Sequence, residues 1–250
     1  MLRQILALFL FAFSALPGHS AEASPYCTRV SHLGGTYIVC TFDPAKKHIA
    51  VRNLDWQGKP YKSFAALARA LWADRVFLRF AMNGGMYDDD YRPIGLYVED
   101  GSESKAINRN KGWGNFHLLP NGVFFLEEGR AGVMETEAFA ASGIRLAFAS
   151  QSGPMLVIDG RIHPAFKIDS DSFKKRNGVG VNSRGEAVFV ISEGLVRFHD
   201  FATLYRDVLG CDNALFLDGT ISGIHVPEWG RSDSLFGFGP IITVEERMPP

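Results

Sequence analysis

Two apolar segments of the sequence end abruptly in a polar residue that is followed by glycine. The first ends at Asn83-Gly84-Gly85 and the second ends at Asp218-Gly219. Glycine lets backbone N–H groups approach a ligand closely, and the end of a strand holds a polar side chain rigidly. A tight turn in which Asn or Asp bonds its own backbone is the alternative for either segment alone. Two such ends, together with Ser152-Gly153-Pro154 and Arg176-Asn177-Gly178, favour a ligand-binding site.

The elements that must position these residues are short strands and a few helices. Residues 75–81 and 214–217 are apolar runs typical of buried strands. Apolar residues recur at helical spacing from Phe64 to Trp72, and again from Phe201 to Leu209, where Asp200 is the expected cap and Gly210 the stop.

Turn residues between apolar runs predict several hairpins. Pro120-Asn121-Gly122 is expected to join strands at 116–119 and 123–126, and Ser183-Arg184-Gly185 to join two later strands. The pattern predicts one α+β domain over residues 24–250, with a mixed β-sheet core and a few packed helices.

The first 23 residues have the pattern of a secretory signal peptide. Arg3 precedes an apolar run from Ile5 to Phe13, and Ala21-Glu22-Ala23 matches a cleavage site. The run is shorter than the roughly 20 residues that span a bilayer. We therefore expect an exported protein, periplasmic or secreted, without a stable membrane anchor after cleavage.

Composition and cysteine content narrow the class of protein further. A hydrophobic content of 46% argues against disorder, and a net charge of −1 argues against a nucleic-acid partner. Cys27 and Cys40 flank the turn Gly34-Gly35, which predicts a disulfide in an exported chain and leaves Cys211 as a buried apolar residue. Three free thiols are the alternative. No cysteine or histidine spacing indicates a zinc site, and no cofactor is expected.

Six short motifs follow one another along the chain. They are Asn83-Gly84-Gly85-Met86-Tyr87, Pro93-Ile94-Gly95, Ser152-Gly153-Pro154, Asp159-Gly160-Arg161, Arg176-Asn177-Gly178-Val179-Gly180-Val181 and Leu217-Asp218-Gly219-Thr220-Ile221-Ser222. Taken in this order, they resemble the motifs of the phosphodiester glycosidase family. The last motif departs from the family pattern, which usually reads Leu-Asp-Gly-Gly-x-Ser-Ser.

The resemblance implies a hydrolase that cleaves the glycosidic bond between a sugar and a phosphodiester on envelope or extracellular glycans. A phosphate monoester is a stable leaving group, so the reaction chiefly needs a carboxylate at the oxocarbenium-like centre and a cation for the phosphate. We expect Asp218 to supply the carboxylate and Arg176 to bind the phosphate. Asp159 and Glu193 are the candidates for a second carboxylate.

Two alternative functions remain open. A non-catalytic glycan- or envelope-binding module would fit the altered loop at Thr220, and a metal-dependent phosphodiesterase would use Asp88-Asp89-Asp90.

Further residues are expected to contact the substrate. Trp113 and Trp229 lie in glycine-rich loops from which an indole ring could stack on a sugar. The expected contacts to sugar hydroxyls or phosphate oxygens are Asn83, Gly84, Gly85, Gly219, Ser222 and His225.

Overall fold

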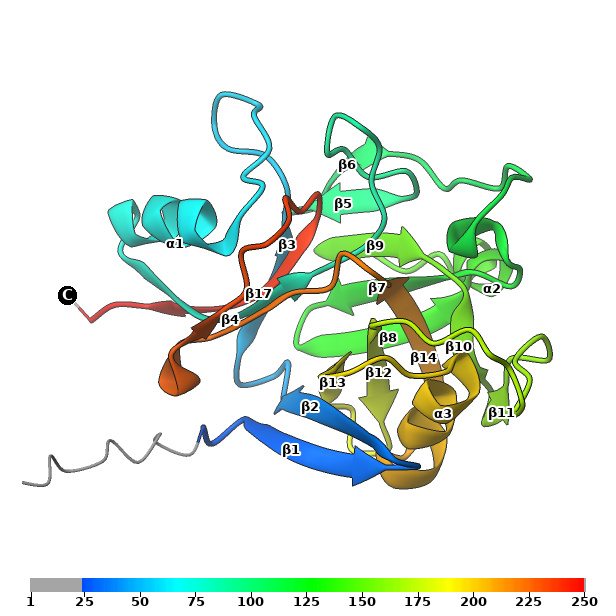
Figure 1. Cartoon of the computed structure of the whole chain (residues 1–250). Coiled ribbons are helices and arrows are strands. Elements are labelled where there is room, and N and C mark those ends of the chain that lie inside the picture. Colours follow the sequence, from blue (N-terminus) through cyan, green and yellow to red (C-terminus); the bar gives the residue numbers. More distant parts are fainter. Residues whose placement is uncertain (1–23, 250) are drawn as a thin grey trace, which may run out of the picture.

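The computed structural model describes residues 24–249, so the predicted signal peptide, residues 1–23, lies outside the described residues. The described chain folds into three β-sheets with three α-helices packed against them (Figure 1). Strands take 43% of the residues and helices 15%, which confirms the α+β prediction. Every strand pair within the three sheets is antiparallel.

The largest sheet carries the strand that ends at Asp218. Its order is β1-β2-β13-β12-β14-β10-β11. Its strands are β1 (Cys27–His32), β2 (Gly35–Phe42), β10 (Met155–Ile158), β11 (Arg161–Ile162), β12 (Asn177–Asn182), β13 (Ala187–Ser192) and β14 (Cys211–Asp218).

Two five-stranded sheets pack beside the largest one. The second sheet, in the order β16-β15-β4-β17-β3, consists of β3 (His48–Arg52), β4 (Val76–Asn83), β15 (Ile224–Val226), β16 (Arg231–Ser232) and β17 (Ile241–Arg247). The third sheet, in the order β6-β5-β9-β7-β8, consists of β5 (Tyr97–Glu99), β6 (Ser102–Lys105), β7 (Gly122–Glu127), β8 (Arg130–Glu135) and β9 (Phe148–Ser152).

The main core lies where the three sheets meet. Phe189 of the largest sheet packs on Phe80 of the second and Phe124 of the third, with ring centroids 5.3 and 5.8 Å apart. All three rings are fully buried. Burial of aromatic side chains is a large source of stability, so this contact ties the sheets into one folded unit.

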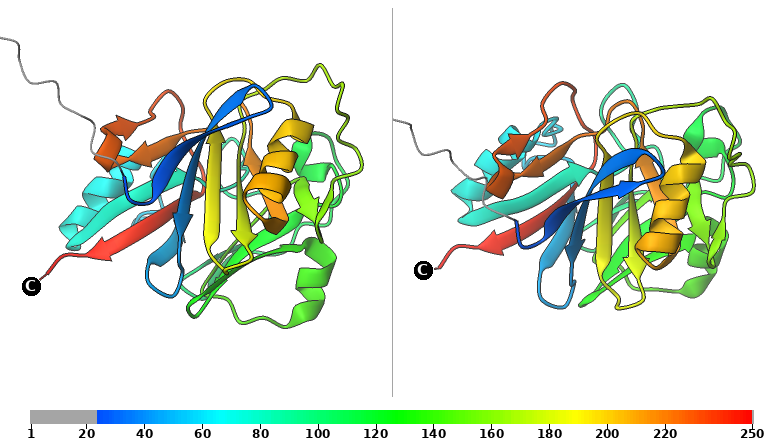
Figure 2. Two further views of the ribbon diagram at one scale, coloured as in Figure 1. Left: turned by 90° about the horizontal axis from the view of Figure 1, so that it is seen from below. Right: turned by 60° about the horizontal axis from the view of Figure 1, so that its bottom comes forward.

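Helices cover the outer faces of the sheets. They are α1 (Phe64–Ala73), α2 (Thr136–Ser142) and α3 (Phe198–Thr203), and a π-helical turn, Leu204–Val208, extends α3. In Figure 2, α3 lies along one face of the largest sheet, where Phe201 and Tyr205 pack on its strands. Gly210 ends this segment with φ +64°, as predicted, whereas the helix begins at Phe198 and Asp200 lies inside its first turn.

The predicted hairpin around Pro120-Asn121-Gly122 is wrong. β7 pairs instead with β8, and residues Asn115–His117 form a 3-10 turn. The Asn121 side chain is buried, where it donates to Phe116 O and accepts from the Thr136 hydroxyl. These bonds connect its loop to α2, so Asn121 does not lie in an exposed turn. The hairpin between β12 and β13 is present as predicted.

The N-terminal hairpin carries the predicted disulfide. Cys27 and Cys40 face each other across β1 and β2 and are bonded. Cys211 is a free, buried thiol, as expected. None of the helices in residues 24–249 is long and apolar enough to cross a membrane.

Candidate functional site

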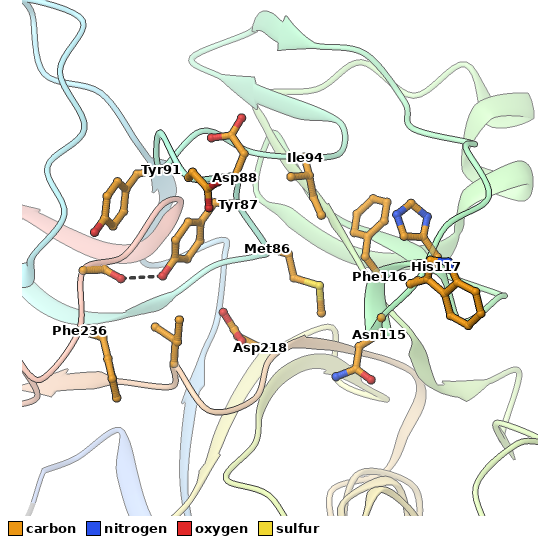
Figure 3. Close-up of a pocket in the computed structure, with 15 residues that line it drawn as sticks. Met86, Tyr87, Asp88, Tyr91, Ile94, Asn115, Phe116, His117, Asp218 and Phe236 are labelled. Carbon is orange, nitrogen blue, oxygen red and sulfur yellow. Dashed lines mark hydrogen bonds between the residues drawn. The ribbon is translucent and has the colours of Figure 1, made fainter.

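Four segments that are distant in sequence enclose one cavity of about 540 Å³. They are the loop after β4, the turn around Asn115–His117, the end of β14 and the loop before β17. This volume falls in the range of small-molecule sites. In Figure 3 the Asp218 carboxyl lies near the middle of the cavity, beside the Met86 side chain.

Asp218 is held at this place by its own backbone and by the following turn. Its N–H donates to Asn177 Oδ1 (2.8 Å), and its Oδ1 accepts from the Gly219 N–H (2.6 Å). The Ser222 hydroxyl donates to Gly219 O and closes the turn. Thr220 does not adopt a positive φ, so the departure from the family's second glycine leaves this loop without strain.

Burial raises the pKa of the Asp218 carboxyl from 3.8 to about 7, against the smaller opposing effect of the Gly219 N–H. None of the residues that line the cavity is lysine or arginine, so nothing on its wall offsets the desolvation of the carboxylate by a full positive charge. The pKa of Tyr87 is raised to about 12, first by burial and then by the charge of Asp218. A carboxyl group that titrates near neutral pH is suited to proton transfer and to nucleophilic attack.

Aromatic side chains line the cavity on both sides of Asp218. In Figure 3, Tyr87, Tyr91 and Phe236 lie to one side, and Phe116 and His117 lie to the other. The rings of Tyr87 and Tyr91 stack with centroids 5.4 Å apart, and the Tyr87 hydroxyl donates to Gly237 O. Trp113, one of the two tryptophans expected to stack on a sugar, also lines the cavity and is 98% exposed. Flat apolar walls with a few polar groups are typical of sugar-binding clefts.

Asn83 lies behind the cavity and does not line it. Its side chain is fully buried, and its Oδ1 accepts from Asn177 Nδ2 (2.7 Å) and from the Gly223 N–H (3.0 Å). The structure therefore brings Asn83 close to the strand end that carries Asp218, through Asn177. Asn83 is connected to Asp218 by the hydrogen bonds of Asn177, and it does not face Asp218 across the cavity.

The two glycines after Asn83 make close protein contacts in place of the expected substrate contacts. The Gly84 N–H donates to Pro240 O, and a Cβ on Gly84 would lie 2.8 Å from the Ile242 side chain. A Cβ on Gly85 would lie 2.7 Å from the Ser150 hydroxyl oxygen. Gly219 and Ser222 likewise use their N–H and hydroxyl groups within the Asp218 turn.

Arg176 is turned away from the cavity, which contradicts its expected role on the phosphate. Its side chain is buried under α3, where Nε donates to Val196 O and Nη2 donates to Ser172 O. Its guanidinium lies 3.5 Å from the ring centroid of Phe198. Burial lowers the pKa of Arg176 to about 10. Neighbouring residues of a strand point to opposite faces, so Asn177 takes the face toward Asp218 and Arg176 takes the other.

Neither candidate for a second carboxylate lies in the cavity. Asp159 is in a turn beside Asp212, six residues along β14 from Asp218, which corresponds to roughly 20 Å. Glu193 is hydrogen-bonded to Arg231 and lies 3.6 Å from Arg29. Both predictions are therefore wrong in placement. The sequence does not show which strands are neighbours or in which direction they pair, so it could not place these carboxylates relative to Asp218.

His225 and Trp229 also lie outside the cavity. The His225 ring bonds the Ser232 hydroxyl and lies beside Phe64, and burial lowers the pKa of this histidine. Trp229 packs against the guanidinium of Arg29, with 4.8 Å between the guanidinium carbon and the ring centroid. These contacts give both residues roles in packing.

The aspartate run is part of the cavity wall without forming a metal cluster. Asp88 and Asp89 line the cavity, and Asp88 Oδ1 accepts from the N–H groups of Asp90 and Arg92. Within residues 24–249 no three histidine, cysteine, aspartate or glutamate side chains are arranged to hold a metal ion. The Asp88 carboxylate stabilises its own turn.

Sequence reasoning missed several residues of the cavity. Phe116 and His117 lie in the segment predicted as a strand, and Phe236 lies in the loop before β17. Gly112 and Gly114, which flank Trp113, were the available signal for a loop at this place. Asn177 was part of a motif, but its contact with Asp218 could not be foreseen without the pairing of β12 and β14.

Comparisons with known proteins agree with the motifs. The family model for phosphodiester glycosidase matches residues 77–226. The uncharacterized protein YigE of Escherichia coli K12 is 40% identical over 195 residues, which cover 77% of this chain and 76% of that protein.

Solved structures share the fold at low sequence identity. The catalytic domain of zebrafish N-acetylglucosamine-1-phosphodiester alpha-N-acetylglucosaminidase, auto-inhibited by its pro-peptide, is 14% identical, with a TM-score of 0.61 over 89% of this chain and 82% of that domain. A predicted exported protein of Burkholderia pseudomallei is 12% identical, with a TM-score of 0.57 over 84% of this chain and 74% of that protein. The family match spans more than half of the chain and the YigE match about three quarters, so this protein belongs to the phosphodiester glycosidase family, a family of hydrolases.

Proposed function

We propose that this protein is an exported hydrolase that cleaves the glycosidic bond between a sugar and a phosphodiester on envelope or extracellular glycans. The observation that carries the proposal is the half-buried Asp218 carboxyl, which faces a cavity with aromatic walls and titrates near neutral pH. The zebrafish relative is named for action on an N-acetylglucosamine-1-phosphodiester. Export is supported by the pattern of residues 1–23 and by the likeness to the Burkholderia protein.

In the proposed reaction Asp218 acts as an ionised carboxylate at the anomeric carbon. The bond between that carbon and the phosphate oxygen breaks, and its electron pair leaves with the phosphate monoester. Asp218 either forms a covalent bond to the sugar, which water then hydrolyses, or takes a proton from the attacking water. Both routes give the free sugar and a phosphate monoester.

The arrangement of the cavity supports roles for other residues in substrate binding. Trp113 and the aromatic rings on either side of Asp218 offer flat surfaces to a sugar ring and its aglycone. Asn115 and His117 are polar groups on the wall that can bond to hydroxyl or phosphate oxygens. Arg176 takes no part in this proposal, because its donors already bind backbone carbonyls.

The proposal predicts that Asp218→Asn loses turnover while it stays folded. Asparagine has nearly the same shape but supplies neither a negative charge nor a proton-transfer group. We expect kcat on a sugar 1-phosphodiester to fall by about three powers of ten or more. The first substrate to test is an N-acetylglucosamine-1-phosphodiester, followed by a panel that varies the sugar and the aglycone.

The pH dependence of kcat/KM tests the protonation state in the same assay. Since the carboxylate must be ionised, kcat/KM should rise with pH and level off above about 7. If Asp218→Asn keeps the turnover of the wild type, Asp218 is a turn residue and the proposal fails. If no phosphodiester is hydrolysed but sugars still bind, the binding-module alternative is correct.

A further inference from the structure

Two buried amides connect the end of β14 to the second sheet. Asn177 Nδ2 donates to Asn83 Oδ1 (2.7 Å) and to Asn83 O (3.1 Å), while Asn177 Oδ1 accepts from the Asp218 N–H (2.8 Å). Both asparagines are fully buried. Asn83 ends β4 and Asn177 begins β12, so this pair of side chains forms a joint between two sheets directly behind Asp218.

A β-bulge explains why the Asp218 N–H needs such an acceptor. Asn177 pairs with Asp218, but Gly178 pairs with Phe216, so Leu217 is the extra residue of β14. A bulge interrupts the regular hydrogen bonding between strands and re-aims the side chain that follows it. At this bulge Asn177 accepts from the Asp218 N–H, and the Ser152 hydroxyl donates to Leu217 O.

We propose that Asn177 is a positioning residue for Asp218, and that its amide, held by Asn83, fixes the bulge that aims the Asp218 carboxyl into the cavity. The inference rests on the proposed function, because it matters for turnover only if Asp218 acts on substrate. The joint also leaves one buried donor, Asn83 Nδ2, without a partner in the described structure. An unpaired buried donor lowers stability, so packing alone does not account for this arrangement.

The carboxyl of Asp218 is itself a probe of its position. The titratable groups that share the cavity with it are Tyr87, Tyr91, Asp88, Asp89 and His117. A change in the angle of the bulge alters the distance of Asp218 from these groups and from water. The pH at which Asp218 titrates therefore reports its position independently of any substrate.

The test compares two variants of Asn177 with a matched control. Asn177→Ala removes the acceptor for the Asp218 N–H, and Asn177→Asp keeps that acceptor but adds an ionisable group beside Asp218. The control is Ser192→Ala. Ser192 is also fully buried, and its hydroxyl oxygen accepts from the backbone N–H of Arg176, the residue directly before Asn177. The control therefore removes a buried acceptor of a backbone N–H near Asn177, as Asn177→Ala does for Asp218. Asp218 is followed by NMR of its carboxyl carbon, and kcat and KM are measured on the best phosphodiester substrate.

We expect Asn177→Ala to lower kcat by roughly 10- to 100-fold with a smaller change in KM, as for a residue that supports a catalytic group. Both Asn177 variants should shift the titration of Asp218, upward in Asn177→Asp, whereas Ser192→Ala should leave titration and kcat unchanged. If the Asn177 variants match Ser192→Ala in both measurements, Asn177 is purely structural and the inference is overturned. If Asp218 titrates differently in the variants but Asp218→Asn retains turnover, the proposed function fails while the positioning stands.

Discussion

At the scale of single residues, the Asp218 carboxyl has a strongly shifted pKa. In an unfolded chain it loses its proton near pH 3.8, whereas in the folded protein burial raises its pKa to about 7. The folded state therefore binds more protons than the unfolded state between these values. The free energy of unfolding consequently falls as the pH rises through this window.

Asp218→Asn should therefore stabilise the protein in a pH-dependent way. We expect a gain of about 2–4 kcal/mol at pH 8, where the wild type must bury a charge, and little gain at pH 3.5. Urea denaturation at the two pH values measures the difference. An equal gain at both values would show that the carboxyl is not desolvated as the structure indicates.

Trp113 allows a second prediction at the residue scale. The Trp113 side chain is almost fully exposed at the cavity, so Trp113→Ala should leave the free energy of unfolding unchanged. Loss of a stacking surface should raise KM for a sugar phosphodiester by about 10-fold, with kcat within about threefold. Trp56 is the matched control because it is 91% exposed and does not line the cavity, and Trp56→Ala should change neither constant.

At the scale of elements, Arg176 connects the segment before α3, which contains Val196, to the largest sheet. Its guanidinium bonds the backbone of Ser172 and Val196 and stacks on Phe198, the first residue of α3. Lysine keeps the charge but cannot donate in two fixed directions or stack as a plane. A buried arginine of this kind contributes to stability more than to substrate binding.

We therefore expect Arg176→Lys to lower the free energy of unfolding by about 2–3 kcal/mol. Activity per folded molecule should stay within about threefold of the wild type, because Arg176 does not line the cavity. The measurements are chemical denaturation and kcat/KM at a temperature where the variant is folded. A large loss of activity without a loss of stability would return Arg176 to the role expected from the sequence.

At the scale of the whole molecule, a group of ion pairs around Arg52 joins the second and third sheets. Arg52 of β3 donates to both carboxylate oxygens of Glu245 in β17 (2.9 and 3.1 Å). The same guanidinium donates to Asp100 and Glu99 at the end of β5. Only 5% of the Glu245 side chain is exposed, so its charge depends on Arg52 for compensation.

Arg52→Leu should destabilise the protein by about 3–5 kcal/mol, since it leaves a buried carboxylate unpaired. The double variant Arg52→Leu/Glu245→Leu should recover most of that loss, and urea denaturation of both variants measures it. We expect a single cooperative transition in the wild type, because the core around Phe189 is shared by all three sheets. If the double variant is no more stable than the single one, the ion pair does not act as the compensating contact.

The amino-acid sequence by itself determined part of the local structure of this protein. Glycine positions and apolar spacing predicted α1, the hairpin of β12 and β13, and the strand that ends at Asp218, because these depend on backbone freedom and on the period of side chains. The disulfide between Cys27 and Cys40 followed from a short turn between two strands. The order of the motifs also indicated the family, which the comparisons confirm.

Only the tertiary structure decided which of these residues meet. Asp159 and Asp218 border neighbouring strands, but at opposite ends, and Arg176 and Asn177 are adjacent in sequence but face opposite sides of the sheet. The cavity wall around Phe116 and His117 comes from a 3-10 turn in a segment whose sequence predicted a strand. Strand order, register and the bulge at Leu217 depend on contacts between residues far apart in the chain, and local spacing carries no information about those contacts.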